Sequence, residues 1–137
     1  MQKQRLIIIC LSLVALILIM VWNGTPTIAQ SGTLDGKTFM GQVGEKGKKK
    51  GDKDKLIFKD GKFRSTACDE YGFGDAPYTA TVNGDITTFE AETFSSEEGK
   101  MKWSGIIKGD TLEGTTVWYP RGNKDPKEYW VRAQLKK

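Results

Sequence analysis

Apolar and polar residues alternate along most of the chain after residue 37, which is the period of β-strands that bury one face. The clearest example is the segment 100–120, in which two strand-like runs flank Gly109-Asp110. A two-residue turn at that pair would place Trp103 opposite Thr116 and give the hairpin one apolar and one polar face. The pattern therefore predicts a hairpin with a buried side and a solvent side.

Two further turn signals, Asp60-Gly61 and Asn83-Gly84, lie between runs of the same kind. Both pairs are typical of type I′ turns, whose two central residues need positive φ. Counting outward from these turns pairs Phe58 with Phe63 and Tyr78 with Phe89. The sequence thus predicts three hairpins with aromatic residues on their inner faces.

Eight strands are predicted in all, from a first strand at 37–43 to a last strand in which Tyr129, Val131, Ala133 and Leu135 alternate with polar residues. Most connections are short, and no stretch after the first thirty residues has helical periodicity longer than a turn or two. Eight successive antiparallel strands favour an all-β, up-and-down meander closed into a small barrel, because closure removes the exposed edges of an open sheet. A two-layer sandwich is the alternative.

Two segments interrupt the alternation. The segment 44–55 contains six lysines, three acids and three glycines, and we expect it to be a solvated loop or, alternatively, an electrostatic patch for an anionic polymer or a phospholipid surface. The segment 67–77 is rich in glycine and acids and carries Tyr71 and Phe73. It either folds back to plug one end of the sheet or forms a lip that gates a ligand or contacts a partner.

The first 29 residues have the layout of a bacterial secretory signal. Lys3 and Arg5 precede an apolar run from 6 to 22, and the small residues Thr27 and Ala29 precede a cleavage point before Gln30. An uncleaved membrane anchor is the alternative. Cleavage would leave residues 30–137 as a single domain, exported across the cytoplasmic membrane and either periplasmic or secreted.

Charge and side-chain chemistry argue against several classes of function. The net charge is +4, and without the two basic residues of the leader it is +2, which does not by itself indicate a nucleic-acid binder. The chain has no histidine, the commonest general base and metal ligand. We therefore predict that the protein is not an enzyme and has no cofactor or metal site.

Cys68 is the single cysteine after the leader, so the domain cannot form an internal disulfide. It is expected to be a small buried residue. Pairing between two chains and a reactive thiol are the alternatives.

The eight-strand meander, the opening segment Leu34-Asp35-Gly36-Lys37-Thr38-Phe39 and the pattern Gly-Asp-Thr-Leu-Glu-Gly at 109–114 resemble the calycin group, the lipocalin-like and avidin-like ligand-binding barrels. The resemblance implies a small hydrophobic or amphipathic ligand bound in the mouth of the barrel.

The first functional hypothesis is accordingly a binding protein for a small apolar or amphipathic ligand. Gly105 and Gly114 face each other in the predicted hairpin and would either leave room inside the barrel wall or mark a sharp bend. The side chains expected to line the ligand site are aromatic: Phe58, Phe63, Tyr71, Phe73, Tyr78, Phe89, Trp103, Trp118 and Tyr129.

The second hypothesis is an extracytoplasmic protein-interaction or envelope-stress domain in which the same aromatic residues form a filled core. A partner, whose identity the sequence leaves open, would then contact the segment 71–77, the lysine loop 48–50, or Trp130, which is predicted to face outward beside Arg132.

Overall fold

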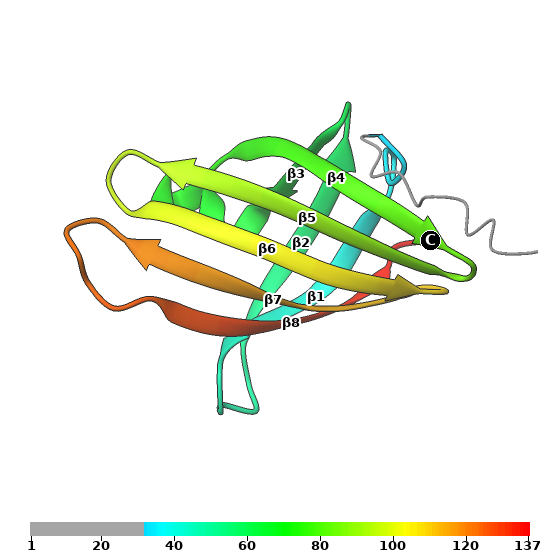
Figure 1. Ribbon diagram of the computed structural model, residues 1–137. Coiled ribbons are helices and arrows are strands. Elements are labelled where there is room, and N and C mark those ends of the chain that lie inside the picture. Colours follow the sequence, from blue (N-terminus) through cyan, green and yellow to red (C-terminus); the bar gives the residue numbers. More distant parts are fainter. Residues whose placement is uncertain (1–31) are drawn as a thin grey trace, which may run out of the picture.

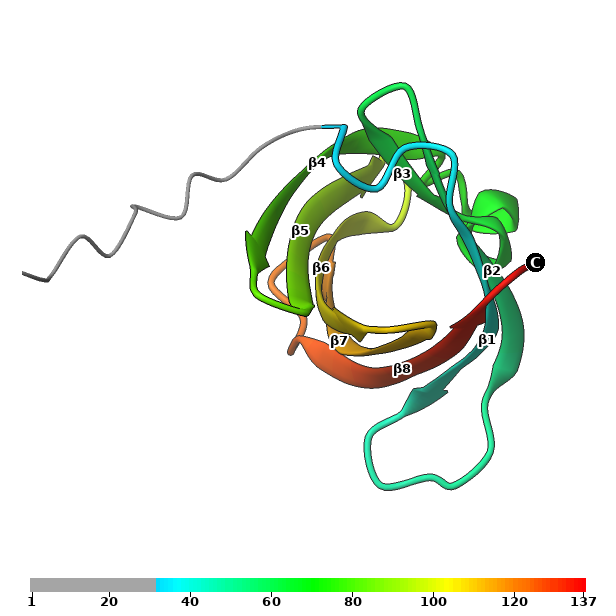
Figure 2. The ribbon, with the colours of Figure 1, turned by 90° about the vertical axis from the view of Figure 1, so that its right-hand side faces the viewer.

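The computed structural model describes residues 32–137, which form a closed eight-stranded antiparallel barrel (Figures 1 and 2). Each strand pairs with its neighbours in chain order, and β8 closes the barrel against β1. The predicted fold class is confirmed, with a barrel rather than a sandwich. The elements are β1 (Thr38–Glu45), β2 (Asp52–Lys59), β3 (Lys62–Ser65), the short 3-10 helix η1 (Thr66–Tyr71), β4 (Asp75–Asn83), β5 (Ile86–Ser95), β6 (Gly99–Lys108), β7 (Thr111–Pro120) and β8 (Lys127–Leu135).

The two ends of the barrel are built differently (Figure 1). One end, called here the hairpin end, carries the tight turns between β2 and β3, β4 and β5, and β6 and β7. The other, the loop end, carries the connections 46–51, 96–98 and 121–126 together with η1. Functional residues concentrate on loops that a rigid scaffold holds, so the loop end is the natural place to look for a site.

The registers of two predicted hairpins are confirmed and the third is wrong by two residues. Phe58 pairs with Phe63, and Trp103 with Thr116, as the turn positions predicted. In the hairpin of β4 and β5 the turn is Gly84-Asp85, so Tyr78 pairs with Ala91 instead of Phe89.

The different turn has a simple conformational cause. Gly84 has a φ of +62° at the first central position, where a type II′ turn requires glycine, and Asn83 remains part of β4. A slip of two residues returns every side chain to the same face, so Tyr78 and Phe89 still point inward.

The interior at the hairpin end is filled by aromatic rings that are 0–2% exposed. Phe58 lies at their centre, with its ring centroid 6.0 Å from that of Phe39, 5.3 Å from Phe63, 5.0 Å from Tyr78 and 5.1 Å from Phe89. These tilted and edge-to-face arrangements are the ones aromatic rings prefer. This aromatic core, Phe39, Phe58, Phe63, Tyr78 and Phe89, leaves the hairpin end packed.

The residues before β1 cover the aromatic core. The backbone N–H of Leu34 donates to the Tyr78 hydroxyl over 2.8 Å, and that hydroxyl donates to Asp35 Oδ1, also over 2.8 Å. Burial, with the hydrogen bond to Asp35, raises the pKa of Tyr78 to about 12. Leu34 is buried and closes the hairpin end.

The loop in the lysine-rich segment is shorter than the sequence predicted. β1 extends to Glu45 and β2 already begins at Asp52, so the prediction of a loop over 44–55 is wrong at both ends. The remaining loop, 46–51, is held against the wall by Trp130, whose indole N–H donates to the Lys48 carbonyl over 2.7 Å. Arg132 lies 4.9 Å above the same ring, so intramolecular contacts occupy much of this indole.

The predicted signal segment, 1–29, lies outside the described residues. Between residues 32 and 137 there is no helix of the length and hydrophobicity needed to cross a membrane.

Candidate functional site

The buried polar residues of residues 32–137 all lie inside the loop-end half of the barrel. Their side chains point inward because alternate residues of a strand face the same side. On β2, Asp54 faces the same side as the buried Leu56 and Phe58. On β7, Thr116 faces the same side as the buried Leu112. All are 0–7% exposed. We call this set the polar layer: Asp54, Ser65, Thr93, Ser95 and Thr116.

Most of the polar layer is paired within the protein. Asp54 accepts hydrogen bonds from the Ser65 hydroxyl over 2.5 Å and from the Ala67 backbone N–H over 3.0 Å. Thr93 Oγ1 accepts from the Trp103 indole N–H over 3.3 Å, and the Ser95 hydroxyl donates to the Tyr71 carbonyl over 2.7 Å. The contacts of Asp54 and Ser95 hold η1 against the inner face of the barrel wall.

Thr116 is the exception. It is 0% exposed, and its hydroxyl is the single buried side-chain polar atom in the described part of the chain without a hydrogen-bond partner. Its cross-strand neighbours are Trp103 on β6 and Tyr129 on β8. A buried hydroxyl without a partner costs about 1–3 kcal/mol, which distinguishes Thr116 from the other members of the polar layer.

The rim of the loop end is formed by half-buried side chains, among them Cys68, Trp118 and Tyr129. The Trp118 indole N–H donates to the Glu98 carbonyl over 2.8 Å, which fixes the ring. The Cys68 thiol lies 3.7 Å from the Met101 sulfur, and burial raises its pKa to about 11. Cys68 is therefore a neutral thiol near neutral pH, and its reactivity is low because little thiolate is present.

The structure distributes the nine residues predicted to line a ligand site over three environments. Phe58, Phe63, Tyr78 and Phe89 belong to the aromatic core, and Trp103 packs 5.0 Å from Phe63 at the boundary with the polar layer. Tyr129 and Trp118 lie at the rim, together with Tyr71 on η1, which is 53% exposed, and the buried Phe73 that follows it. Only Trp103 and the four residues at the rim adjoin the polar layer.

The room expected beside Gly105 and Gly114 is already occupied. A Cβ on Gly105 would lie 2.4 Å from a ring carbon of Phe89, and one on Gly114 would lie 2.3 Å from the Ser104 carbonyl oxygen. The opposed glycines thus admit the Phe89 ring and a close strand pair, and they do not enlarge a pocket.

Asp54 and Thr116 are the residues that the sequence reasoning missed as parts of a site. Asp54 was assigned to a solvated loop because its neighbours are charged, although extending the alternation of Phe58 and Leu56 by one more step places it inside. Desolvation raises the pKa of its carboxyl, and the hydrogen bonds from Ser65 and Ala67 counteract part of the effect. Within residues 32–137 no group of three or more acidic or cysteine side chains is placed to hold a metal ion.

The stability of the protein should fall as the pH rises through the range in which Asp54 ionises. The unfolded carboxyl, with a pKa of 3.8, ionises first, whereas the folded, buried carboxyl keeps its proton to a higher pH. The stabilisation is therefore full below the unfolded pKa and is lost through the raised folded pKa. Cys68, the titratable group on η1 that faces it, stays protonated in this range. Urea unfolding from pH 3.5 to 8 should show a smaller decrease for Asp54→Asn than for the wild type, and parallel curves would contradict the assignment.

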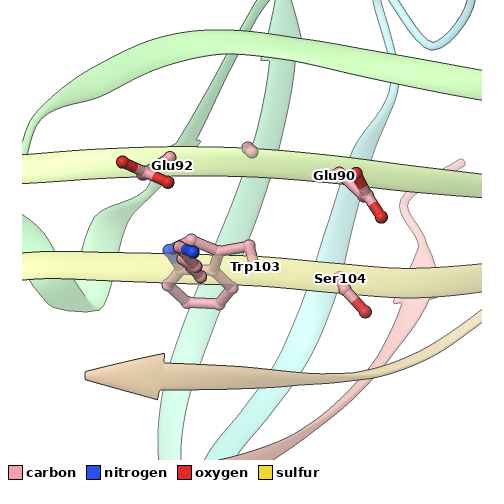
Figure 3. Close-up of a pocket in the computed structure, with 6 residues that line it drawn as sticks. Glu90, Glu92, Trp103 and Ser104 are labelled. Atoms are coloured by element: carbon pink, nitrogen blue, oxygen red, sulfur yellow. The ribbon is translucent and has the colours of Figure 1, made fainter. Parts of the chain in front are cut away.

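A concavity of about 430 Å³ lies on the outer wall over β5 and β6 (Figure 3). Glu90, Glu92 and Ser104 line it, together with Lys102, while Trp103 contributes from the buried side. The Glu92 carboxylate already lies 3.7 Å from the Lys100 ammonium group. This outer depression has paired or exposed charges and no unsatisfied buried group, so it is a weaker candidate than the polar layer.

Comparisons of the chain with protein-family models, with curated proteins and with solved structures found no match. The functional argument therefore depends on the geometry of the barrel.

Proposed function

We propose that the protein is an exported binding protein for a small amphipathic molecule, which enters the barrel at the loop end. In this proposal a polar group of the ligand bonds to the Thr116 hydroxyl, and the apolar part lies against Trp118 and Tyr129 at the rim. The buried, unpaired hydroxyl of Thr116 is the observation that carries the proposal, since native proteins rarely leave such a group unsatisfied.

The filled hairpin end limits the size of the ligand. Closely packed rings occupy the interior from Phe39 to Phe89, so a ligand can penetrate only as far as the polar layer. Eight-stranded barrels have interiors that either are filled by side chains or hold one small ligand, and in this proposal the hairpin end is the filled part. A molecule the size of one aromatic ring with a short polar arm fits this division better than a long acyl chain.

Replacing Thr116 by valine tests the proposal, because valine keeps the shape and removes the hydroxyl. We expect the affinity for small aromatic and amphipathic probes, measured by titration of tryptophan fluorescence, to fall about tenfold, equivalent to about 1.4 kcal/mol. The free energy of unfolding should stay the same or rise by about 1 kcal/mol, because an unsatisfied group has been removed.

Thr115→Val is the matched control, since Thr115 is the next residue of β7 and its side chain faces solvent. This variant should bind the probes as the wild type does. Failure of a broad panel of probes to change the fluorescence, or equal affinities of the two valine variants, would count against a ligand site at Thr116.

A protein-interaction domain with a filled core is the second candidate. It is favoured by Phe94 and Tyr71, which are 61% and 53% exposed at the loop end and belong to neighbouring segments, since Ser95 bonds to the Tyr71 carbonyl. A comparison of proteins retained from envelope extracts by the wild type and by Phe94→Ser would test it. Identical sets of retained proteins would argue against this surface.

A further inference from the structure

Basic side chains gather on the outer wall of the barrel at β2 and β3. The buried residues of β2 alternate with outward-facing ones, and three of the outward-facing residues are lysines. Two more basic residues face outward on β3, where they alternate with the buried Phe63 and Ser65. We call this set the basic face: Lys53, Lys55, Lys59, Lys62 and Arg64.

The lysines of the basic face have no acidic partner. Five ion pairs occur within residues 32–137, and none includes one of these four lysines. Arg64 differs, because it pairs with Asp69 over 2.5 Å and has Asp75 as its cross-strand neighbour. Lys59 and Lys62 face each other directly, an arrangement that is unfavourable for like charges. The four lysines therefore present positive charge that the chain itself does not pair.

The opposite wall of the barrel has mixed charge. β6 lies four strands away from β2 in the closed barrel, on its other side (Figure 2). Its exposed Lys102 has Glu92 of β5 as cross-strand neighbour, and the same carboxylate pairs with Lys100 over 3.7 Å. The basic face is thus a property of one side of the barrel and not of the whole surface.

The lysine-rich loop 46–51 extends the basic face beyond the end of β2. It connects β1 with β2 and projects from the barrel (Figures 1 and 2). Lys49 and Lys50 are exposed in this loop and belong to none of the five ion pairs. The Trp130 indole, which donates to the Lys48 carbonyl, holds the loop in place. A projecting, positioned loop beside a charged wall suits an extended partner better than a small one.

The basic face also borders on exposed apolar surface. Met40 on β1 pairs with Lys55 on β2 and with Gln134 on β8, and it is 47% exposed. The half-buried Ile57 lies between Lys55 and Lys59 on the same side of β2. Ammonium groups pair with lipid phosphates, and apolar side chains enter the boundary between headgroups and acyl chains. This combination favours a phospholipid surface over a soluble polyanion.

We propose that the basic face and the lysine-rich loop dock the barrel onto a membrane surface that contains anionic phospholipids. The predicted export across the cytoplasmic membrane would bring the chain to such a surface. The docking uses the outside of the barrel wall, so it is independent of the ligand proposed for the interior.

Binding of the intact chain to phospholipid vesicles tests the proposal. Vesicles of phosphatidylcholine with about one third phosphatidylglycerol are compared with vesicles of phosphatidylcholine alone by co-sedimentation at low salt. The leader is the same in all variants, so the readout is the ratio of the two affinities. Each lysine near an anionic surface is worth about fivefold in affinity, so Lys53→Gln/Lys59→Gln should lower this ratio by at least about tenfold.

Lys102→Gln/Lys108→Gln is the matched control, because it removes the same charge from two exposed positions of β6. Its ratio should stay within about twofold of the wild-type value. All four substituted lysines are exposed, and equal midpoints of urea unfolding would verify that both variants are folded. Equal losses in the two variants, or no preference of the wild type for anionic vesicles, would overturn the proposal.

Met40→Gln separates a bilayer from a soluble polyanion. It should weaken binding to the anionic vesicles about threefold, because an apolar side chain no longer enters the interface. Binding to dextran sulfate, which has negative charge and no apolar layer, should not change. Binding of the wild type to dextran sulfate without binding to vesicles would overturn the membrane proposal and identify an anionic polymer as the partner.

Discussion

Phe58→Ala is expected to lower the free energy of unfolding by about 3–5 kcal/mol, a large part of the 5–15 kcal/mol that stabilises a typical domain. The Phe58 side chain is fully buried, and its ring lies within 6.0 Å of four other aromatic rings from β1, β3, β4 and β5. Alanine would leave a cavity that the closed wall cannot collapse to fill. Urea denaturation followed by tryptophan fluorescence would measure the loss.

Phe94→Ala is the matched control for this variant. It removes the same side chain from a position that is 61% exposed, and its effect should stay within about 0.5 kcal/mol. A loss below about 1.5 kcal/mol in Phe58→Ala would mean that the rings at the hairpin end are loosely packed. The ligand that we propose could then reach deeper into the barrel than the polar layer.

The barrel could be predicted because its local signals agree with one another. Asp60-Gly61 and Gly109-Asp110 define two-residue turns, and the alternation on either side of each turn leaves a single register that buries the apolar face. The turn at Asn83-Gly84 was misplaced because Asn-Gly suits a type I′ turn, whereas Gly84-Asp85 suits a type II′ turn. Two-residue periodicity cannot separate registers that differ by two residues.

The candidate site was harder to predict than the fold, because its residues are polar. The prediction searched for large aromatic side chains, and most of those became core. Thr116 was identified as the partner of Trp103 without any sign that its hydroxyl would be unpaired, since that depends on what β6 and β8 place beside it. Asp54 was hidden by the charged residues on both sides, which lie outside the barrel while Asp54 lies inside.

The two halves of the barrel interior differ in the chemistry of their side chains. Rings that contact one another stabilise the hairpin end without any ligand, so the fold does not depend on occupancy of the other half. The loop end can then retain an unpaired hydroxyl and a buried carboxyl, whose combined cost the aromatic core offsets.

Gly41→Ala is expected to reduce stability by at least about 3 kcal/mol, because the added methyl group would separate the strands that close the barrel. Gly41 pairs with Asp54 on β2 and with Ala133 on β8. A Cβ at this position would lie 1.9 Å from the Arg132 carbonyl oxygen and 2.5 Å from the Ala133 Cα, and both of these are backbone atoms that cannot rotate away. The midpoint of urea unfolding and the near-ultraviolet dichroism of Trp130, on the same strand as Ala133, would report the change.

Gln42→Ala serves as the control, since Gln42 is the next residue of β1 and its side chain is exposed on the outer face. Its effect should be within about 0.5 kcal/mol. If both variants unfolded at the same urea concentration, β1 and β8 would have to lie farther apart in solution than a closed barrel allows. Because β1 and β2 carry Gly41 and Asp54 side by side, a selective loss in Gly41→Ala should also weaken binding at the polar layer, whereas Gln42→Ala should leave it unchanged.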